Sequence, residues 1–288
     1  MREPVTTVRV SSLLGHGQVE LAILCLGSLL RFAAEPLALR LHDDGSLTAA
    51  DAELLRASLG DVELVWRRQA DERIEEELAR YPVLRGYRRQ SALALKLLDA
   101  PLWAVEELCY CDTDVLFFRP FRGLFARPEG AGLFMTDRQN AYSVRSWHLL
   151  RHRRLRLVRR LNSGVIAMPR ERLDLDLLEW FLGHAEFRFA PVWVEQTGWA
   201  LLARRGPCRL LSARQLVLPA AGGAVARDCV GAHFVGAVRG ELPRWRRELE
   251  GADPGGAPPE ALRSHRAGAC TAVHLAVSEA RRVLARRR

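Results

Sequence analysis

Leu108 to Pro120 reads LCYCDTDVLFFRP: an apolar strand runs into Asp112 and Asp114 and then continues as an apolar stretch. Burying two carboxylates beside such a run is costly unless something compensates their charge. Side chains two positions apart share one face of an extended segment, so we expect both acids to converge on one hard divalent cation, Mg²⁺ or Mn²⁺, together with substrate phosphates. The alternative interpretation is a turn in which the aspartates cap backbone amides.

Strand-like and helix-like patterns alternate on both sides of this stretch. Strands are predicted at 5–12, 37–41, 61–66, 104–111, 131–136 and 162–168, and helices at 19–33, 48–58, 71–80 and 86–99. This alternation predicts an α/β layer fold: a Rossmann-like, mostly parallel central sheet flanked by helices, with ligands bound outside the carboxyl ends of the strands. We expect residues 1–250 to form a single domain, 251–259 (GADPGGAPP) a linker, and 260–288 a basic C-terminal helix.

The composition narrows the class of protein. The 288 residues are 49% apolar and 27% charged, which is typical of soluble globular proteins with a sizeable core. The longest apolar run, Leu21 to Leu30, is too short to span a bilayer and has no basic segment directly ahead of it, so we expect no signal peptide. The six cysteines form no C-x-x-C pair, which argues against a zinc ribbon or a disulfide framework. These features predict a cytoplasmic protein.

The net charge of +9 favours anionic partners such as phosphates, acidic lipids or nucleic acid. Lys96 is the only lysine, so the other 42 basic residues are arginines, an excess that base composition alone would also produce. The C-terminal helix ends in three arginines, which predicts either peripheral contact with anionic lipid at the inner face of the membrane or an ordinary solvated helix.

Four segments in order resemble one family. YCDTDVLFFRPF is similar to the aspartate motif of GT-A fold glycosyltransferases, especially the retaining family 8 enzymes related to galactosyltransferases and glycogenin. The other matching segments are Asn162–Val165 (NSGV), the pair Glu195–Gln196, and His233–Gly236 (HFVG) followed by Arg239. The resemblance covers roughly residues 5 to 250 and implies a metal-dependent enzyme that transfers a sugar from a nucleotide sugar.

The sequence departs from the family pattern at several positions. Cys111 stands where leucine is usual, and Arg239 replaces a lysine, so a planar fork takes the place of a point charge. The proline and tryptophan of the last motif come later, at Pro243 and Trp245. Serines, Ser11 and Ser12, occupy the first strand where the family has an acidic contact to the base, so the nucleotide is only weakly specified.

The resemblance assigns roles to individual residues. It implies that Asp112, Asp114 and His233 bind Mn²⁺ or Mg²⁺, which bridges the donor diphosphate and acts as a Lewis acid on the leaving group. A lone histidine is more often a structural residue, so the role of His233 depends on the Gly236 and Arg239 that follow it. The residues expected to contact the nucleotide sugar are Asp112, Lys96, Gly236, Arg239 and Asp43. Alternatives are a snorkelling side chain for Lys96 and a turn for Asp43 and Asp44.

Asn162, Glu195 and Gln196 are expected to face the donor sugar and the acceptor. Glu195 would pair with a sugar hydroxyl or stabilise oxocarbenium-like charge, although an acid favoured by the helix dipole is the plainer interpretation. The resemblance implies retention of anomeric configuration and a glycan or lipid-linked acceptor. The arginine-rich segment 145–160 is a candidate site for an anionic acceptor; a solvated helix face is its alternative.

Three other functions compete with this one. A sugar nucleotidyltransferase would carry a glycine-rich basic loop after the first strand, but Leu13–Gly17 (LLGHG) has no lysine or arginine. A nucleic-acid-binding protein would interleave basic residues with exposed aromatics, whereas most aromatics here fall in apolar strands, so no nucleic acid is expected. A catalytically inactive sugar-binding relative is the third, and the paired acids argue against it.

Overall fold

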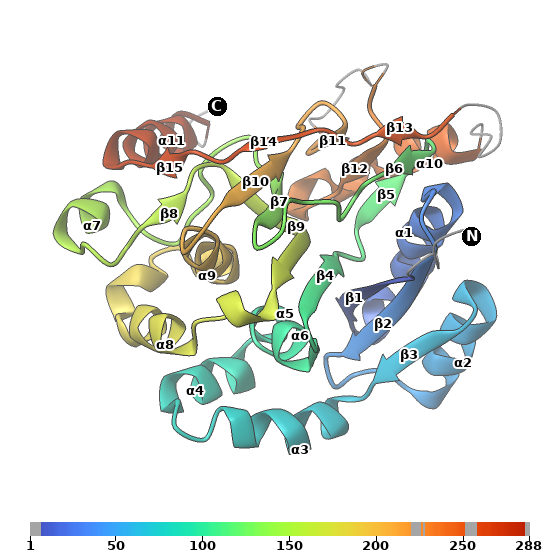
Figure 1. The fold of residues 1–288 in the computed structure, drawn as a ribbon, viewed down its shortest axis with the longest axis horizontal. Helices are drawn as coiled ribbons and strands as arrows, with labels where there is room; N and C mark the ends of the chain where they lie inside the picture. Colours follow the sequence, from blue (N-terminus) through green and yellow to red (C-terminus); the bar gives the residue numbers. More distant parts are fainter. Residues whose placement is uncertain (1–6, 220–225, 227, 251–257, 286–288) are drawn as a thin grey trace.

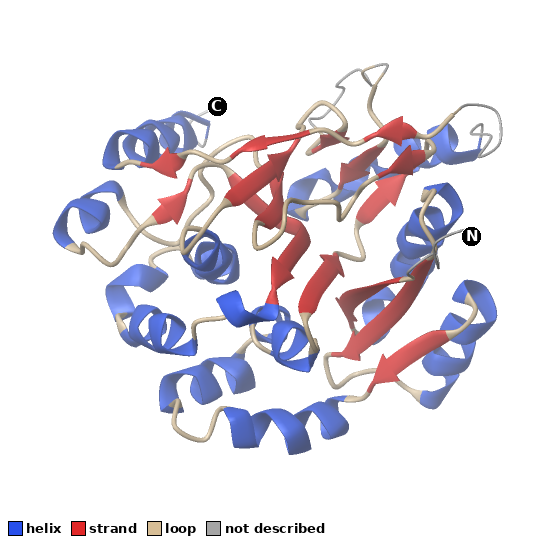
Figure 2. Cartoon of the chain, viewed as in Figure 1, coloured by secondary structure: helices blue, strands red, loops and turns tan. Residues whose placement is uncertain are grey.

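An eight-stranded mixed sheet with helices on both faces forms the centre of the molecule (Figures 1 and 2). The computed structural model describes residues 7–219, 226, 228–250 and 258–285. In spatial order the strands are β14 (Ser264–Arg266), β10 (Cys208–Leu211), β7 (Gly132–Thr136), β9 (Leu161–Pro169), β4 (Glu107–Cys111), β1 (Val8–Leu14), β2 (Leu37–Asp43) and β3 (Val62–Val65).

Parallel pairing outnumbers antiparallel pairing in this sheet. Within the described residues, β10–β7, β4–β1, β1–β2 and β2–β3 are parallel, whereas β14–β10, β7–β9 and β9–β4 are antiparallel. Helices α1 (Val19–Phe32) and α2 (Ala49–Leu59) connect β1 to β2 and β2 to β3, as parallel neighbours require. The strand order reverses beside β1, whose neighbours are β2 on one side and β4 on the other, which places a crevice at their carboxyl ends.

The pleat of β4 explains why both faces of the sheet are covered. Leu108 and Tyr110 belong to the apolar cluster on one face, and Cys109 and Cys111 belong to the cluster on the other. Each cluster is closed by helices. On the first face these are α3 (Arg67–Glu77), α4 (Pro82–Gln90), α5 (Ala92–Leu97), α6 (Asp99–Trp103), α8 (Leu175–Gly183) and α9 (Val194–Ala203); on the second they are α1, α2 and α10 (Leu242–Glu250).

Some predicted helix bounds change. The helix expected at 86–99 is divided among α4, α5 and α6, because Ser91 takes an extended conformation that ends one helix before the next begins. The helix expected at 71–80 begins earlier, at Arg67. The start of α2 follows the prediction closely, since Thr48 caps it: its hydroxyl accepts from the Asp51 amide at 3.2 Å, and the Asp51 carboxylate accepts from the Thr48 amide at 2.8 Å.

A second sheet lies against the α1 face. It consists of β11 (Leu216–Val217), β12 (Gly231–His233) and β5 (Val115–Phe117), with β12 antiparallel to β5. Because β4 belongs to the large sheet and β5 to the small one, the residues between them form the junction of the two sheets.

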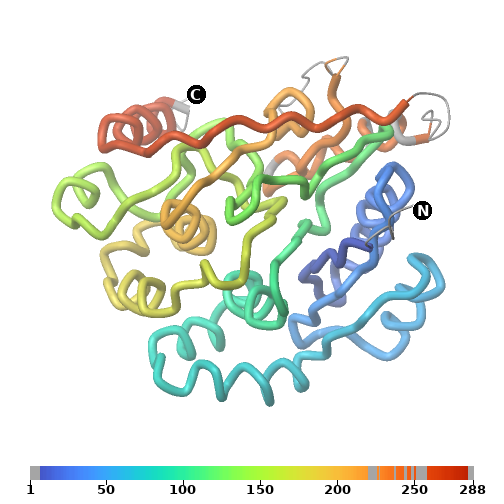
Figure 3. Tube along the Cα trace, viewed as in Figure 1, coloured from blue at the N-terminus to red at the C-terminus, as the bar shows by residue number. Residues whose placement is uncertain are grey.

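The chain after the linker differs from its prediction. Residues 251–257 of the expected linker lie outside the described residues. The helix expected from 260 begins only at Ala272, as α11 (Ala272–Ala285), because the preceding residues form short strands: β13 (Glu260–Ala261) pairs with β6 (Phe121–Arg122), β14 with β10, and β15 (Ala269–Cys270) with β8 (Leu157–Val158). Figure 3 shows this stretch crossing the molecule before α11. α11 then packs beside α7 (Ser146–Arg151) (Figure 1).

No helix within the described residues combines the length and the apolar character needed to cross a membrane.

Candidate active site

A cavity of about 1110 Å³ opens at the carboxyl edge of the central sheet, where the strand order predicts a crevice. Segments that follow successive strands contribute to its wall: Gly15 after β1, Asp44 after β2, Asp112 after β4 and Asp137 after β7. The antiparallel β9 contributes Asn162 from its amino end. The cavity therefore extends from β2 to β7, across five neighbouring strands of the sheet.

Asp112, Thr113 and Asp114 form a turn at the junction of the two sheets. The Asp112 amide donates to Gly164 O at 2.8 Å, and the Val115 amide donates to Asp112 O at 3.3 Å. The sequence suggested an extended segment here, but residues 112–114 form a turn instead. Both carboxylates nevertheless lie close to one another, on either side of the turn.

His233 lies beside the two aspartates. It ends β12, where it pairs in register with Val115 of β5, and the next amide, that of Phe234, donates to Asp114 O at 2.9 Å. Its Nε2 lies 3.0 Å from Asp114 Oδ1 and 3.5 Å from Asp112 Oδ2. One ligand atom from each of Asp112, Asp114 and His233 lies within 4.8 Å of the others.

Asn162 fixes the orientation of the imidazole. Its Oδ1 accepts from the Gly164 amide at 2.9 Å, which identifies this atom as the oxygen, and the same oxygen lies 3.0 Å from His233 Nδ1. The Nδ1 atom therefore carries a proton, and Nε2 points at the two carboxylates. This is the usual way in which a partner orients a ligating histidine.

The charges in the group shift its pKa values. Burial favours the neutral imidazole, but Asp114 and Asp112 outweigh burial and raise the pKa of His233 above its ordinary value. Burial would raise the pKa of Asp114, yet His233 and Arg239 lower it to about 2. The two acids thus favour the protonated form of His233 more than burial opposes it.

These residues fit a divalent cation. Two carboxylate oxygens and an imidazole nitrogen are a donor set that Mn²⁺ accepts well and Mg²⁺ tolerates, and the cavity leaves space for further oxygen ligands. The backbone also provides for the ring: a Cβ on Gly164 would lie 2.4 Å from the Nδ1 and Cε1 atoms of His233. Only glycine at this position leaves His233 where the donor set needs it.

Solved structures share this architecture. Mouse xyloside xylosyltransferase 1, in its apo form, matches with a TM-score of 0.58 at 14% identity, over 81% of this chain and 99% of its own. The galactosyltransferase LgtC, in complex with donor and acceptor sugar analogues, matches with a TM-score of 0.50 at 14% identity, over 88% of this chain and 98% of its own. The chain has the GT-A fold. No family model matches the sequence, and no curated protein matches it.

The GT-A fold expected from the sequence is thus confirmed. Neither matched structure is a sugar nucleotidyltransferase or a nucleic-acid-binding protein, the two alternative interpretations. Nine of the ten residues proposed from the sequence for the site line the cavity: Lys96, Asp112, Asp114, Asn162, Glu195, Gln196, His233, Gly236 and Arg239.

Asp43 is the exception. One of its oxygens accepts from the Gly45 and Leu47 amides at 2.8 and 3.1 Å, and the other accepts from the Arg67 amide at 3.2 Å. These bonds hold the turn after β2, so Asp43 does not line the cavity, and the interpretation as a turn is the correct one. Its neighbour Asp44 does line the cavity; the space beside Gly15 admits it, since a Cβ there would lie 2.3 Å from Asp44 Oδ2.

Lys96 lies in a buried network of charges within the GT-A cavity. Its Nζ donates to Asp112 Oδ2 at 2.8 Å and to Ser163 Oγ at 3.2 Å, and lies 3.5 Å from Glu195 Oε1. Burial lowers its pKa, but Asp112 and Glu195 outweigh this effect and raise it. The side chain is only 4% exposed, so it does not snorkel to solvent.

Glu195 and Gln196 open α9 beneath the cavity. Burial raises the pKa of Glu195, although Lys96 opposes it, and its Oε1 lacks a hydrogen-bond partner among the described residues. The Gln196 amide group accepts from Asn162 Nδ2 at 3.2 Å and donates to Asp137 Oδ2 at 3.3 Å and Ala141 O at 2.9 Å. Gln196 therefore links the ends of β9 and β7.

Asp137 is a cavity residue that sequence reasoning missed. It directly follows β7, is 4% exposed, and has a pKa raised by burial. Its signal was available, because an acid after a predicted strand in an α/β fold lies at the ligand-binding edge.

Arg239 approaches from outside the sheet. It lies on the short helix η5 (Gly236–Glu241), and its guanidinium contacts Asp114 Oδ2 at 3.0 Å while half of its side chain remains exposed. Gly236 has a φ of 49°, a left-handed conformation that favours glycine, and the chain turns there toward Arg239.

The arginine-rich segment 145–160 lies elsewhere. None of its residues lines the cavity, and it contains α7 and β8 rather than one helix. Arg145, Arg151, Arg153 and Arg154 are exposed, which agrees with a solvated surface.

Proposed function

We propose that the protein transfers a sugar from a nucleotide sugar, a UDP-sugar, to a glycan or lipid-linked acceptor, with retention of configuration, and depends on Mn²⁺ or Mg²⁺. The observation that carries this proposal is the convergence of Asp112, Asp114 and His233 inside the cavity of a GT-A fold. Retention is supported by the sequence resemblance to a retaining family. A cytoplasmic location and peripheral membrane contact remain predictions from the sequence.

The donor would lie along the cavity from β2 toward β7. The loops with Gly15 and Asp44 are assigned to the nucleoside, and Asp112, Asp114 and His233 would hold the cation, which would supply charge neutralisation for the diphosphate leaving group. Arg239 is exposed enough to turn from Asp114 to a phosphate, with bidentate geometry.

We assign Lys96 a role other than the phosphate contact suggested by the sequence. It would pair with Asp112 and Glu195 and hold the two side chains in place, because both acids lie within 3.5 Å of its Nζ.

The donor sugar would lie against Glu195, Gln196 and Asn162. Apart from its ion pair with Lys96 at 3.5 Å, Glu195 Oε1 forms no hydrogen bond within the described residues, so it is placed to accept from a sugar hydroxyl, and a carboxylate there would stabilise oxocarbenium-like charge at the anomeric carbon. Gln196 and Asn162 are hydrogen-bonded to each other and would form the surface that contacts the sugar.

A thermal-shift panel of nucleotides and nucleotide sugars tests this function. We expect UDP-sugars to raise the melting temperature only with Mn²⁺, since a ligand at 100 times its Kd adds about 2.7 kcal/mol of stability. Slow Mn²⁺-dependent hydrolysis of the same donor should accompany this shift. Equal shifts with and without Mn²⁺ would contradict the metal assignment.

Asp114→Asn should remove both signals while the fold persists, because the amide keeps the shape of the side chain and loses the ligand charge. We expect hydrolysis to fall by more than the roughly 10–100-fold caused by losing an outer partner of a ligand. Asp176→Asn, at an exposed position on α8, is the matched control and should behave as wild type. Unchanged turnover in Asp114→Asn would refute the site.

A further inference from the structure

The end of the cavity away from the nucleoside loops is built by two segments far apart in sequence. Arg138 and Gln139 follow β7, and Arg281 belongs to α11; all three line the cavity. In the sheet, β7 is separated from β4 by β9, whereas β1 and β2 lie on the other side of β4. Arg138 is therefore across the metal-ligand group from Gly15 and Asp44.

Helix α11 is fixed to this wall by polar contacts. Asn140 Nδ2 donates to Ser278 Oγ at 3.0 Å and to His274 O at 3.1 Å, and an Arg282 nitrogen donates to Asn140 O at 3.1 Å. The Arg282 guanidinium also lies 4.6 Å from the ring centre of Trp193, which directly precedes α9. These contacts hold Arg281 at the cavity beside the loop that carries Arg138.

The arginines of this wall differ from the other cations of the cavity. Lys96 and Arg239 are paired with carboxylates, as described above. Arg138 donates weakly to Pro219 O at 3.4 Å, and within the described residues neither Arg138 nor Arg281 forms an ion pair. The nearby Asp137 carboxylate is taken by the Gln139 amide and Gln196. Two guanidinium groups thus line the cavity without a carboxylate partner from the part of the chain that the structure describes.

We propose that Arg138 and Arg281 bind an anionic group, a phosphate or carboxylate, carried by the acceptor. The inference rests on the proposed function, which places the donor at the other end of the cavity, so that the second substrate enters past these side chains. Guanidinium groups match the geometry of both anions and bind them with charge-assisted hydrogen bonds. This proposal places the anionic-acceptor site at the wall formed by the β7 loop and α11, and not in segment 145–160, where the sequence suggested it.

Calorimetry on the full-length protein saturated with UDP and Mn²⁺ tests the proposal. UDP fills the donor phosphate site, so a second anion must bind elsewhere. We expect glucose 6-phosphate to bind at least about tenfold more tightly than glucose, the range of one charge-assisted hydrogen bond. The double variant Arg138→Gln/Arg281→Gln should bind both sugars equally and bind UDP–Mn²⁺ as wild type does.

The double variant Arg151→Gln/Arg153→Gln, which removes an equal charge from two exposed residues outside the cavity, is the control and should keep the preference. Equal affinity for the two sugars in wild type, or a preference that persists in the double variant, would overturn the inference and leave the proposed function intact. The titration of UDP and Mn²⁺ is measured before any sugar is added. If the protein does not bind UDP and Mn²⁺, the proposed function is overturned, and this inference with it.

A second titration with octyl phosphate distinguishes the source of the anion. Arginine-dependent binding that is tighter for octyl phosphate than for glucose 6-phosphate assigns a lipid-linked acceptor, and the reverse order assigns a soluble one. If neither phosphate shows arginine-dependent binding, the site does not exist.

Discussion

At Gly164 a single methyl group decides whether the histidine can reach the acids. A Cβ there would lie 2.4 Å from two atoms of the His233 ring and 3.0 Å from Asn162 Oδ1. We expect Gly164→Ala to displace the imidazole and to lower the affinity for Mn²⁺ in the presence of UDP by about 10–100-fold. Titration calorimetry measures this affinity directly.

Gly86 supplies the matched control, because an added Cβ there meets no atom within 4 Å. In α4 the change from glycine to alanine should stabilise the fold by about 0.5–1 kcal/mol and leave the Mn²⁺ affinity unchanged. Wild-type affinity in Gly164→Ala would show that His233 does not need its present position.

Individual site residues were predictable where their signal is local. Asp112 and Asp114 interrupt an apolar strand, and His233 stands in a short motif, so the sequence pointed to all three. Asp137 was missed although it follows a predicted strand, because one isolated acid carries less signal than a pair. The role of Lys96 was not predictable, since its partners Asp112 and Glu195 are 16 and 99 positions away and only the fold brings them together.

Helix α11 shows how an element outside the family resemblance becomes part of the cavity wall. Its link to the β7 loop depends on Asn140, which donates to Ser278 and His274 and whose Oδ1 accepts from the Arg160 amide at 2.9 Å. We expect Asn140→Ala to leave buried groups unsatisfied, at a cost of about 1–3 kcal/mol, and to loosen α11 locally. Hydrogen exchange should then quicken in 272–285 and not in β1, β4 or β9.

Ser46→Ala controls for the loss of a polar contact at the opposite end of the cavity, where the Ser46 hydroxyl accepts from the His16 amide. That variant should leave exchange in α11 as it is in wild type. An unchanged exchange rate of α11 in Asn140→Ala would mean that the helix is held by other contacts, such as its packing on α7.

Among elements, the long periodic segments were predictable and the short strands were not. The strands expected at 131–136 and 162–168 appear as β7 and β9 with bounds shifted by one residue. β13, β14 and β15 have only two or three residues each, which is too short for an alternating pattern to be recognised. Their pairing partners lie far away in sequence, so residues 260–271 were mistaken for the start of a helix.

For the molecule as a whole, stability should depend on pH through His42. It is buried on β2, with Nε2 3.4 Å from Ser11 Oγ and Nδ1 without a hydrogen-bond partner in the described structure. Burial, aided by the charge of Arg40, lowers its pKa to about 3. The folded protein therefore keeps His42 neutral where the unfolded chain takes up a proton, so the stabilisation present above pH 6.5 is lost progressively as the pH falls toward 3.

Between pH 6.5 and 5.5, the difference in the pKa of His42 between the folded and the unfolded chain should lower the free energy of unfolding by about 1 kcal/mol. In His42→Leu the decline over the same interval should be smaller by that amount, whatever the absolute stability of the variant. Urea denaturation in the presence of a chelator measures both slopes with His233 free of metal. Identical slopes would contradict the assignment.

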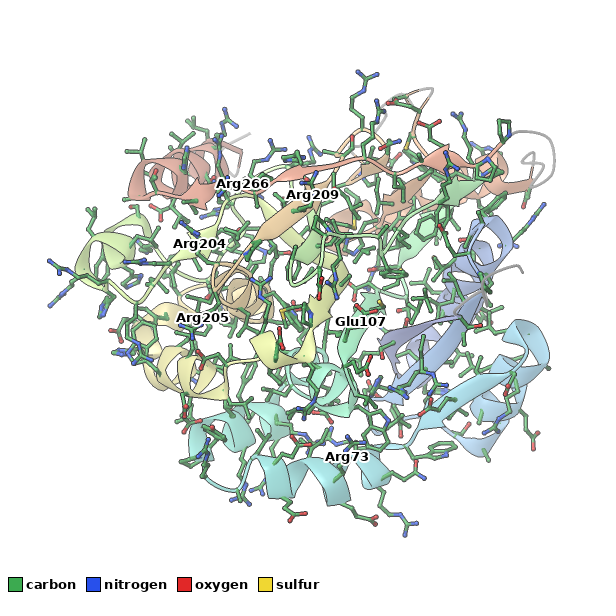
Figure 4. All side chains as sticks on the ribbon, viewed as in Figure 1. Arg73, Glu107, Arg204, Arg205, Arg209 and Arg266 are labelled. Carbon is green, nitrogen blue, oxygen red and sulfur yellow. The ribbon has the colours of Figure 1, made fainter. Side chains whose placement is uncertain are left out.

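The net charge is the whole-molecule property that predicts least about function. Figure 4 shows Arg73 in the lower part of the view and Arg266 in the upper part, so arginines are carried by elements far apart in the molecule. Several are tied to acids or to the backbone: Arg88 is buried against Asp99, and Arg172 binds Pro207 O at 2.8 Å and Ala203 O at 3.0 Å. The fold was predictable from the order of its strands and helices, whereas the distribution of charge emerges only after folding.

The aspartate turn between β4 and β5 has one more consequence. His233, on the small sheet, follows Asp112, at the end of β4 in the large sheet, by more than a hundred residues, so an ion held by both would close a long loop of chain and join two separately hydrogen-bonded sheets. Closing such a loop restricts the freedom of everything between its ends in partly opened states. If such an ion is bound, its release would loosen the smaller sheet first, because its strands are short, and His233 belongs to that sheet.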